Sequence, residues 1–140
     1  MTALAVLDAS VVVKWFVREG EADLRAADAV RADVVREREV FVVPSLFAYE
    51  VLSTLCRRLR DPADVRACLD LWLALGVPVV EPDGLLLALA VDLAFRYRLT
   101  GYDAAYVALA KHVNGVWLTC DRPASRRVAA TRLVRLVADA

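Results

Sequence analysis

Short, continuous apolar runs alternate with longer segments of helical periodicity along the whole chain. Apolar runs without alternation are typical of strands that are buried on both faces. They predict strands at residues 4–7, 40–43, 77–80, 116–119 and 133–137. Helical spacing predicts helices at residues 21–37, 45–60, 62–75, 83–97 and 101–113, with a short one after Asp121. This alternation indicates an α/β fold in which helices sandwich a parallel sheet.

Capping residues and glycine mark several of the predicted helix ends. Asp61-Pro62 places a capping residue before a proline at the first helical position, and Ser45 could cap the helix after Pro44. Asn114-Gly115 is a C-terminal stop signal. In the helix that ends there, Tyr102 and Tyr106 fall on an apolar stripe, which predicts core positions. No repeat or linker interrupts the pattern, so residues 1–140 are expected to form a single domain.

Composition narrows the classes of function. Hydrophobic residues make up 59% of the 140 residues, enough for a large core, and the 18 basic and 18 acidic residues balance. The net charge of zero gives no argument for nucleic-acid binding by the whole molecule, so such a site would have to be local. The three cysteines are odd in number and lack close spacing, which predicts neither a disulfide framework nor a zinc site. With no signal-peptide pattern and no membrane-length apolar run, the expected location is the cytoplasm.

Carboxylates recur at the places where predicted strands end. Asp8 follows the first strand, Asp121 follows the fourth, and Glu50 lies about one turn into the helix that leaves the second. Ligands of open parallel sheets bind at the carboxyl ends of the strands, so these acids should share one edge. Asp103, in the first turn of the helix before the fourth strand, joins them if the loop at residues 97–101 brings the chain back.

Each of these acids also has an ordinary structural explanation. Asp8 and Asp121 could cap the turns that follow them, and Asp103 lies three residues after Thr100, the spacing of a capping box. Glu50 cannot cap, and no Lys or Arg stands three or four residues away to pair with it. Burying an unpaired carboxylate is expensive, so Glu50 is either exposed at the surface or part of a site.

Taken together, the acids favour a divalent metal. Carboxylates that crowd at one edge repel each other, and a hard cation such as Mg²⁺ or Mn²⁺ relieves this repulsion. Ions held by acids most often act on phosphate esters. Two other classes of phosphate chemistry fit less well. Phosphatases of the D-x-D type need an acid where Ser10 stands, and receiver domains need adjacent acids after the first strand.

Four segments resemble the PIN-domain family, in particular the VapC-type toxins of prokaryotic toxin–antitoxin pairs. They are Val6–Ser10, Pro44–Val51, Tyr102–Ala110 and Leu118–Asp121, and their order and spacing span nearly the whole chain. The resemblance implies a three-layer α/β/α sandwich with a central, mainly parallel sheet of about five strands. It also implies a Mg²⁺- or Mn²⁺-dependent endoribonuclease that cleaves RNA phosphodiesters with a metal-activated water. One stretch departs from the family pattern, because Arg122–Ser125 stands where relatives often carry an acid or amide and then a large apolar residue.

The resemblance assigns roles to particular residues and implies partners. One or two ions would be held by Asp8, Glu50, Asp103 and Asp121, with Ser10 and Thr119 in support. Such toxins are homodimers neutralised by a small VapB-like antitoxin, and the helices at 45–60 and 62–75 are candidate surfaces for both contacts. A nuclease of housekeeping RNA processing and a non-catalytic PIN-like interaction module are the alternatives.

Basic residues near the predicted edge are weaker candidates. Lys14, Arg122 and Arg126 could contact RNA phosphates, but each could equally be a solvated surface residue. Ser10 and Thr119 could likewise be structural. His112, the only histidine, sits in the last turn of its helix, where positive charge suits the helix dipole, and is not expected to take part in catalysis.

Overall fold

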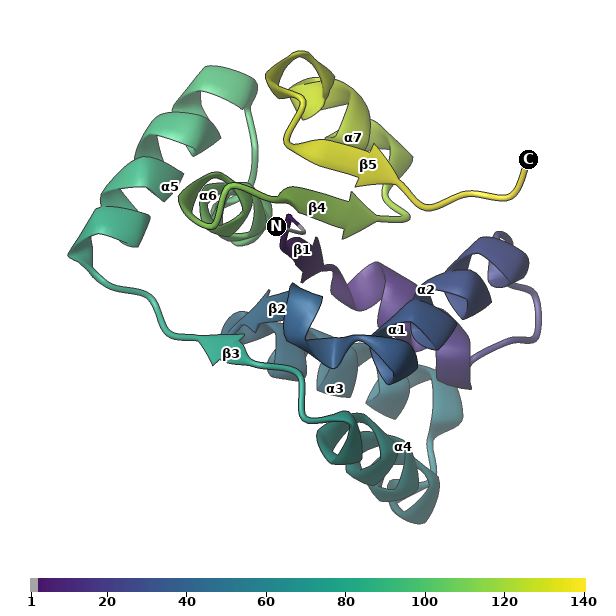
Figure 1. Cartoon of the computed structure of the whole chain (residues 1–140). Coiled ribbons are helices and arrows are strands. Elements are labelled where there is room, and N and C mark those ends of the chain that lie inside the picture. The colour runs from purple at the N-terminus through teal and green to yellow at the C-terminus, as the bar shows by residue number, and fades with distance from the viewer. Residues whose placement is uncertain (1–2) are drawn as a thin grey trace.

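A single parallel sheet forms the centre of the computed structural model, which describes residues 3–140. Its strands lie in the order β3-β2-β1-β4-β5, and each neighbouring pair is parallel. Figure 1 shows the strands and the helices around them. The strands are β1 (Ala5–Leu7), β2 (Phe41–Pro44), β3 (Val79–Val80), β4 (Val116–Thr119) and β5 (Val134–Leu136). All five predicted strands are therefore present, and the predicted α/β class is confirmed.

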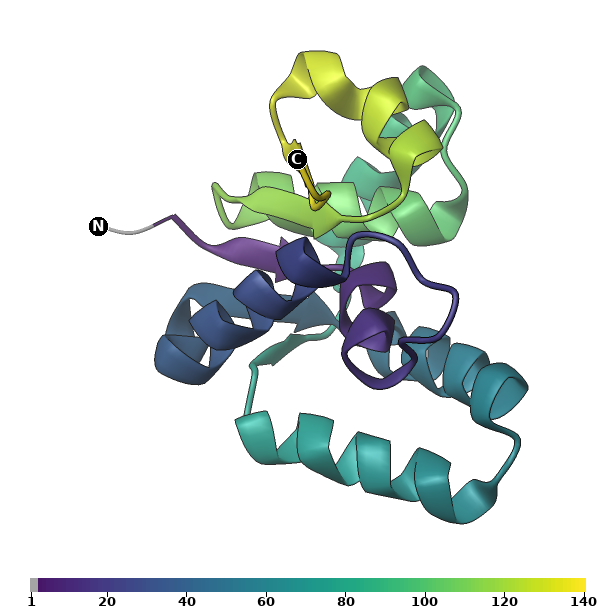
Figure 2. The same cartoon turned by 90° about the vertical axis from the view of Figure 1, so that its right-hand side faces the viewer.

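Helices connect the strands, and α6 contacts β1, β2 and β4 while it pairs with α5 along its length. Both views show α4 at the outer edge of the molecule, where it packs against α3 (Figures 1 and 2). Two 3-10 turns lie at Arg38–Val40 and Ala129–Thr131. The helices are α1 (Ala9–Phe16), α2 (Leu24–Arg36), α3 (Leu46–Leu59), α4 (Pro62–Leu75), α5 (Gly84–Tyr97), α6 (Gly101–His112) and α7 (Arg122–Val128).

The core begins in the first apolar stretch. Val6 and Leu7 of β1 and Val11 and Val12 of α1 are completely buried, because strand and helix are apolar on nearly every side. An aromatic cluster fastens the outer helix α4 to this core. The ring centroid of its Trp72 lies 4.6 Å from that of Phe47 on α3 and 6.3 Å from that of Trp15 on α1. The fold thus holds the end of β1 rigidly, which matters for the residue that follows it.

Most of the predicted helix ends are confirmed. The Asp61 carboxylate accepts a hydrogen bond from the backbone N–H of Ala63, and Asn114 ends α6 in the left-handed region at φ 56°. The cap predicted at Ser45 is wrong, because Ser45 already has helical backbone angles and its side chain makes no capping hydrogen bond. The core position predicted for Tyr102 is also wrong. It is 67% exposed, because it stands in the first turn of α6 at the mouth of a groove beside α5.

Candidate metal and phosphate site

The strand order has a switch point at its centre. From β1 the chain builds outward to β2 and β3 on one side, and β4 and β5 lie on the other. Open α/β sheets bind ligands at the carboxyl ends of the strands at such a point. Asp8 directly follows β1, and Asp121 follows β4 with one residue between. The two acids therefore stand at the carboxyl ends of adjacent strands, as the sequence predicted.

A polar pocket of about 410 Å³ opens at this edge. Carboxylates from five places line it: the ends of β1 and β4, helix α3, the first turn of α6 and, with Glu21, the loop between α1 and α2. The loop before α6 therefore brings Asp103 to the same edge as the other three acids. The pocket is lined by Asp8, Ala9, Ser10, Val13, Lys14, Glu21, Glu50, Thr54, Arg57, Arg58, Asp103, Cys120 and Asp121.

Asp8 is held in place by hydrogen bonds to both of its carboxylate oxygens. Its Oδ2 accepts from the backbone N–H of Ser10 at 3.0 Å and from the hydroxyl of Thr119 at 3.2 Å. Its Oδ1 accepts from the indole N–H of Trp117 at 3.1 Å. The side chain therefore does cap α1, and Oδ1 keeps unused acceptor capacity because a carboxylate oxygen can accept more than one hydrogen bond. Burial raises the pKa of Asp8, although these hydrogen bonds oppose the rise.

Ser10 and Thr119 join the ends of β1 and β4. The hydroxyl of Ser10 accepts from the backbone N–H of Cys120 at 3.0 Å and lies 3.4 Å from the hydroxyl of Thr119. The Thr119 hydroxyl in turn accepts from the backbone N–H of Asp121 at 3.0 Å. These bonds set the spacing between Asp8 and Asp121, so the two hydroxyl residues position the acids.

A pair of buried aromatic rings lies beneath the acids, and sequence reasoning missed its role. Tyr106 and Trp117 stack with centroids 5.8 Å apart. Trp117 donates to Asp8 as described, and the Tyr106 hydroxyl donates to Glu50 Oε1 at 2.6 Å. Tyr106 was assigned to the core, which is correct, but its polar tip also needed a partner. That requirement was the available signal that it reaches an acid.

Repulsion among the acids shows in their pKa values. Burial, and then the charges of Asp8 and Asp121, raise the pKa of Asp103 to about 6, against a smaller opposing effect of Arg127. Burial and the charges of Asp8 and Asp103 likewise raise the pKa of Glu50, although the Tyr106 hydroxyl opposes this. Within residues 3–140 no hydrogen bond is made by the Asp103 carboxylate, whose backbone N–H is capped by Thr100.

The raised pKa of Asp103 predicts that this residue lowers the free energy of unfolding of the metal-free protein by an amount that depends on pH. Between its unfolded value near 3.8 and its folded value of about 6, the folded state binds more protons than the unfolded state. The free energy of unfolding contributed by this group therefore falls as pH rises through that window. In EDTA, Asp103→Asn should match the wild type at pH 4 and be more stable than it at pH 7. Urea unfolding at both values measures this, and a difference that does not change with pH would contradict it.

The donor set fits a hard divalent cation. It consists of carboxylates and hydroxyls, with mutual repulsion that a cation would relieve. In the part of the chain that the structure describes, no three or more His, Cys, Asp or Glu side chains are already arranged around a common centre that could hold a metal ion. The Asp103 carboxylate makes no hydrogen bond within residues 3–140, so it is the acid least restrained from moving toward a bound ion.

Two of the three predicted phosphate contacts lie outside this pocket. Arg122 instead makes a two-pronged ion pair with Asp23, with nitrogen–oxygen distances of 3.0 and 3.3 Å. Arg126 is exposed on α7 and does not line the pocket. Lys14 does line it. Sequence reasoning missed Arg57, Arg58 and Glu21, which also line the pocket.

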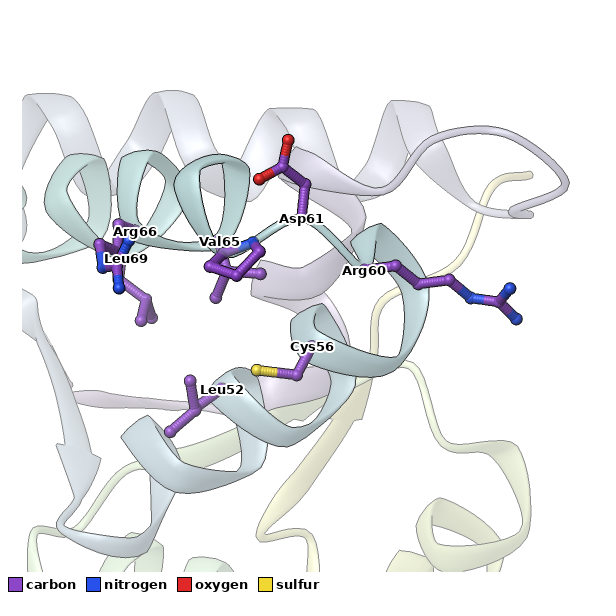
Figure 3. Close-up of a pocket in the computed structure, with 8 residues that line it drawn as sticks. Leu52, Cys56, Arg60, Asp61, Val65, Arg66 and Leu69 are labelled. Carbon is purple, nitrogen blue, oxygen red and sulfur yellow. The ribbon is translucent and has the colours of Figure 1, made fainter.

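A second cavity of about 310 Å³ lies between α3 and α4. Figure 3 shows Leu52 and Cys56 of α3 facing Val65 and Leu69 of α4 across it, while Arg60 points away. It contains one carboxylate, the capping Asp61, and no grouping of acids. This cavity is therefore a surface groove between two helices rather than a second chemical centre.

Comparison with known proteins agrees with the geometry. The family model of the PIN domain matches residues 5–130. Ribonuclease VapC3 of Pyrobaculum aerophilum is 33% identical over 130 residues, covering 89% of this chain and 95% of that protein. A toxin–antitoxin complex from Klebsiella pneumoniae shares the fold with a TM-score of 0.69 at 17% identity, covering 97% and 99% of the two chains.

A further solved structure, VapC20 of Mycobacterium tuberculosis, is described as a sarcin-ricin-loop-cleaving toxin. It superposes with a TM-score of 0.67 at 18% identity, covering 87% of this chain and 93% of that one. At such identities the two structures show a shared fold only, whereas the family match and the 33% identical relative show common descent. The chain belongs to the PIN-domain family.

Proposed function

We propose that this protein is a Mg²⁺- or Mn²⁺-dependent endoribonuclease. The observation that carries the proposal is the meeting of Asp8, Glu50, Asp103 and Asp121 at one polar pocket on the switch point of the sheet. Membership of the PIN family and the likeness to a protein named ribonuclease VapC3 support it. One or two divalent ions are the proposed cofactor.

Each acid has a distinct part in this proposal. Asp8 would offer Oδ1 to the metal, because its Oδ2 is already engaged by Ser10 and Thr119. Asp103 and Asp121 would complete the ligand set, with Glu50 binding directly or through water. When bound, the ion activates water and neutralises charge on the phosphate. Tyr106 orients Glu50, and Trp117 orients Asp8.

RNA cleavage by the purified chain tests this function. We expect single-stranded RNA to be cut in the presence of Mg²⁺ or Mn²⁺, and we expect EDTA to stop the reaction. Separation of labelled products on a denaturing gel measures the rate. Failure to cleave any member of a diverse RNA pool with either metal would leave the non-catalytic interaction module as the better account.

We further propose that the nuclease acts as the toxin of a toxin–antitoxin pair in the cytoplasm, with its 140 residues as one domain. The likeness to VapC3 and to the Klebsiella complex supports this reading over housekeeping RNA processing. The candidate binding site for a small antitoxin is the apolar groove between α3 and α4 (Figure 3). These are the two helices expected to carry partner contacts. Co-expression with the product of a neighbouring short gene should abolish the RNase activity.

We also propose that the protein is a homodimer, and exposed apolar residues make α5 a candidate contact surface beside α3 and α4. Leu87, Val91 and Phe95 lie four residues apart along α5 and are all exposed, Phe95 at 85%. A two-fold interface uses the same patch on both subunits, so this stripe would pack against its own copy. We expect Phe95→Glu to convert a dimer into a folded monomer, measured by light scattering during size-exclusion chromatography. A dimer that survives this change would place the interface elsewhere, with α3 and α4 the next candidates.

A further inference from the structure

The acidic pocket has a basic side that the metal proposal does not use. Helix α3 supplies most of it, because Glu50, Thr54, Arg57 and Arg58 follow one another at the spacing i, i+4, i+7 and i+8. Residues at this spacing share one face of a helix. The same face therefore carries an acid of the proposed metal site at one end and two arginines two turns farther on.

The distance along the helix separates these arginines from the metal site. Seven residues of α-helix span about 10 Å. Arg57 and Arg58 thus begin about two turns along α3 from Glu50, yet they line the same pocket. Groups in this place can hold a neighbouring phosphate of the same strand.

A carboxylate from another element already occupies the space between two of the cations. Glu21 Oε2 accepts from Arg58 Nη1 at 3.2 Å, and Glu21 Oε1 accepts from Lys14 Nζ at 3.3 Å. Burial alone would raise the pKa of Glu21, but the hydrogen bonds from Arg58 and Lys14 lower it. Glu21 is therefore charged and bridges two cations with two oxygens, as a phosphate would.

The loop that carries Glu21 is held in place at both ends. Lys14 Nζ donates to the carbonyl of Ala22 at 2.8 Å, and Arg58 Nη2 donates to the carbonyl of Glu19 at 3.3 Å. At the end of the loop, Arg122 binds Asp23, as described above. Arg122 thus fixes the end of the loop. Cations are favoured near a helix C-terminus, which explains why arginines are tolerated at the end of α3. This preference does not explain the hydrogen bonds between Arg58 and the loop.

Arg57 differs from its neighbours in having no counter-ion. It makes no ion pair within residues 3–140, although it lines a pocket that contains several acids. An arginine fork suits a phosphate that is shared with a second arginine. An acidic protein segment is a poorer occupant, because it would bring a run of carboxylates beside the five that already line the pocket.

We propose that Arg57 and Arg58 form a phosphate-binding rim for the RNA strand, adjacent to the cleavage site, and that Glu21 is the resident counter-ion whose place the phosphate takes. This inference rests on the proposed ribonuclease function and adds the contacts that hold its substrate. Lys14 anchors Glu21 and the loop, which accounts for its place at the pocket.

RNA binding in EDTA tests the rim without cleavage. The probe is a short fluorescein-labelled single-stranded RNA of mixed sequence, and fluorescence anisotropy is followed over a series of salt concentrations. Arg57→Gln and Arg58→Gln should each weaken binding about tenfold and flatten the salt dependence by about 0.7 in log–log slope, the effect of one lost phosphate contact. Arg57→Lys should restore much of the affinity. Glu21→Gln should act in the opposite direction and tighten binding.

The matched control is Arg25→Gln, which removes the same charge from an exposed position on α2 outside the acidic pocket. It should leave affinity and slope unchanged. Equal weakening in all three arginine variants would mean that binding follows net charge and would overturn the rim. Unchanged RNA binding in Arg57→Gln and Arg58→Gln would overturn it too, and weaker binding of an oligo-glutamate peptide would then assign the arginines to an acidic protein. Weaker binding in Glu21→Gln would overturn the displacement by phosphate.

Cleavage assays run in parallel separate this inference from the proposed function. A wild-type chain that cleaves RNA, with rim variants that bind RNA normally, would remove the rim and leave the nuclease. A wild-type chain that binds RNA through the rim but never cleaves it would remove the nuclease and leave an RNA-binding surface. Thermal unfolding of each variant confirms that it is folded.

Discussion

Replacing Asp103 by Asn is expected to reduce metal-dependent RNA cleavage about a thousandfold, which corresponds to about 4 kcal/mol of transition-state stabilisation. Asp103 is the most direct acid to change, because its carboxylate makes no hydrogen bond within residues 3–140. The amide is nearly the same size but carries no charge, so a metal would lose a ligand while the helix cap at Thr100 remains. Initial rates at saturating Mn²⁺ measure the effect.

Two controls make this result specific. Asp92→Asn removes the same charge from an exposed position on α5 and should cleave RNA at the wild-type rate. Mn²⁺ should raise the unfolding temperature of the wild type, since a ligand of the folded state stabilises it, but not that of Asp103→Asn. Asp8→Asn is a less direct test, because an amide would also disturb the donors from Ser10, Thr119 and Trp117. Full activity in Asp103→Asn would contradict the proposed ligand set.

Replacing Gly115 by Ala is expected to destabilise the fold by about 3 kcal/mol, the range of severe backbone clashes. A Cβ at this position would lie 2.8 Å from the carbonyl carbon of Leu4 and closer still to its oxygen. That oxygen accepts the hydrogen bond from Val116 N–H at 3.2 Å, at the start of the contact between β1 and β4. Relieving the clash would therefore separate the two strands that carry Asp8 and Asp121. The free energy of unfolding in urea measures the loss.

Gly84 offers a matched control for this change. It lies at the start of α5, and a Cβ there would meet no atom within 4 Å. Gly84→Ala should therefore be neutral or slightly stabilising, since alanine favours the helix and restricts the unfolded chain. If both variants lost the same stability, the close approach of the Leu4 carbonyl would not be the reason that residue 115 must be glycine.

The sequence was sufficient for the strands and for most of the helices, although not for α1 (Ala9–Phe16), and for the edge at which the acids meet. Buried parallel strands are recognisable as apolar runs, and a residue that follows such a strand must lie at the sheet edge, which places Asp8 and Asp121. Capping did not compete with this placement. Asp8 and Asp121 each cap a helix and still line the pocket, because a cap uses only part of a carboxylate's acceptor capacity.

What the sequence did not reveal depends on contacts between distant segments. Arg122 was a candidate for RNA because it follows Asp121, but its partner Asp23 lies 99 residues away. The bond from Tyr106 to Glu50 spans 56 residues and could only be suspected from the need to satisfy a buried hydroxyl. The helical spacing from Glu50 to Arg58 can be recognised in the sequence. Only the structure shows that a distant loop brings Glu21 beside Arg58.

A crystal of this protein soaked in Mn²⁺ and measured for anomalous scattering tests the central claim most directly. The account predicts a peak in the acidic pocket with oxygens of Asp8, Asp103 and Asp121 at about 2.1 Å, the distance typical of Mg²⁺ ligands. It also predicts that this peak is lost in crystals of Asp103→Asn. A pocket without a peak at saturating Mn²⁺, or a peak confined to His112, would contradict the account.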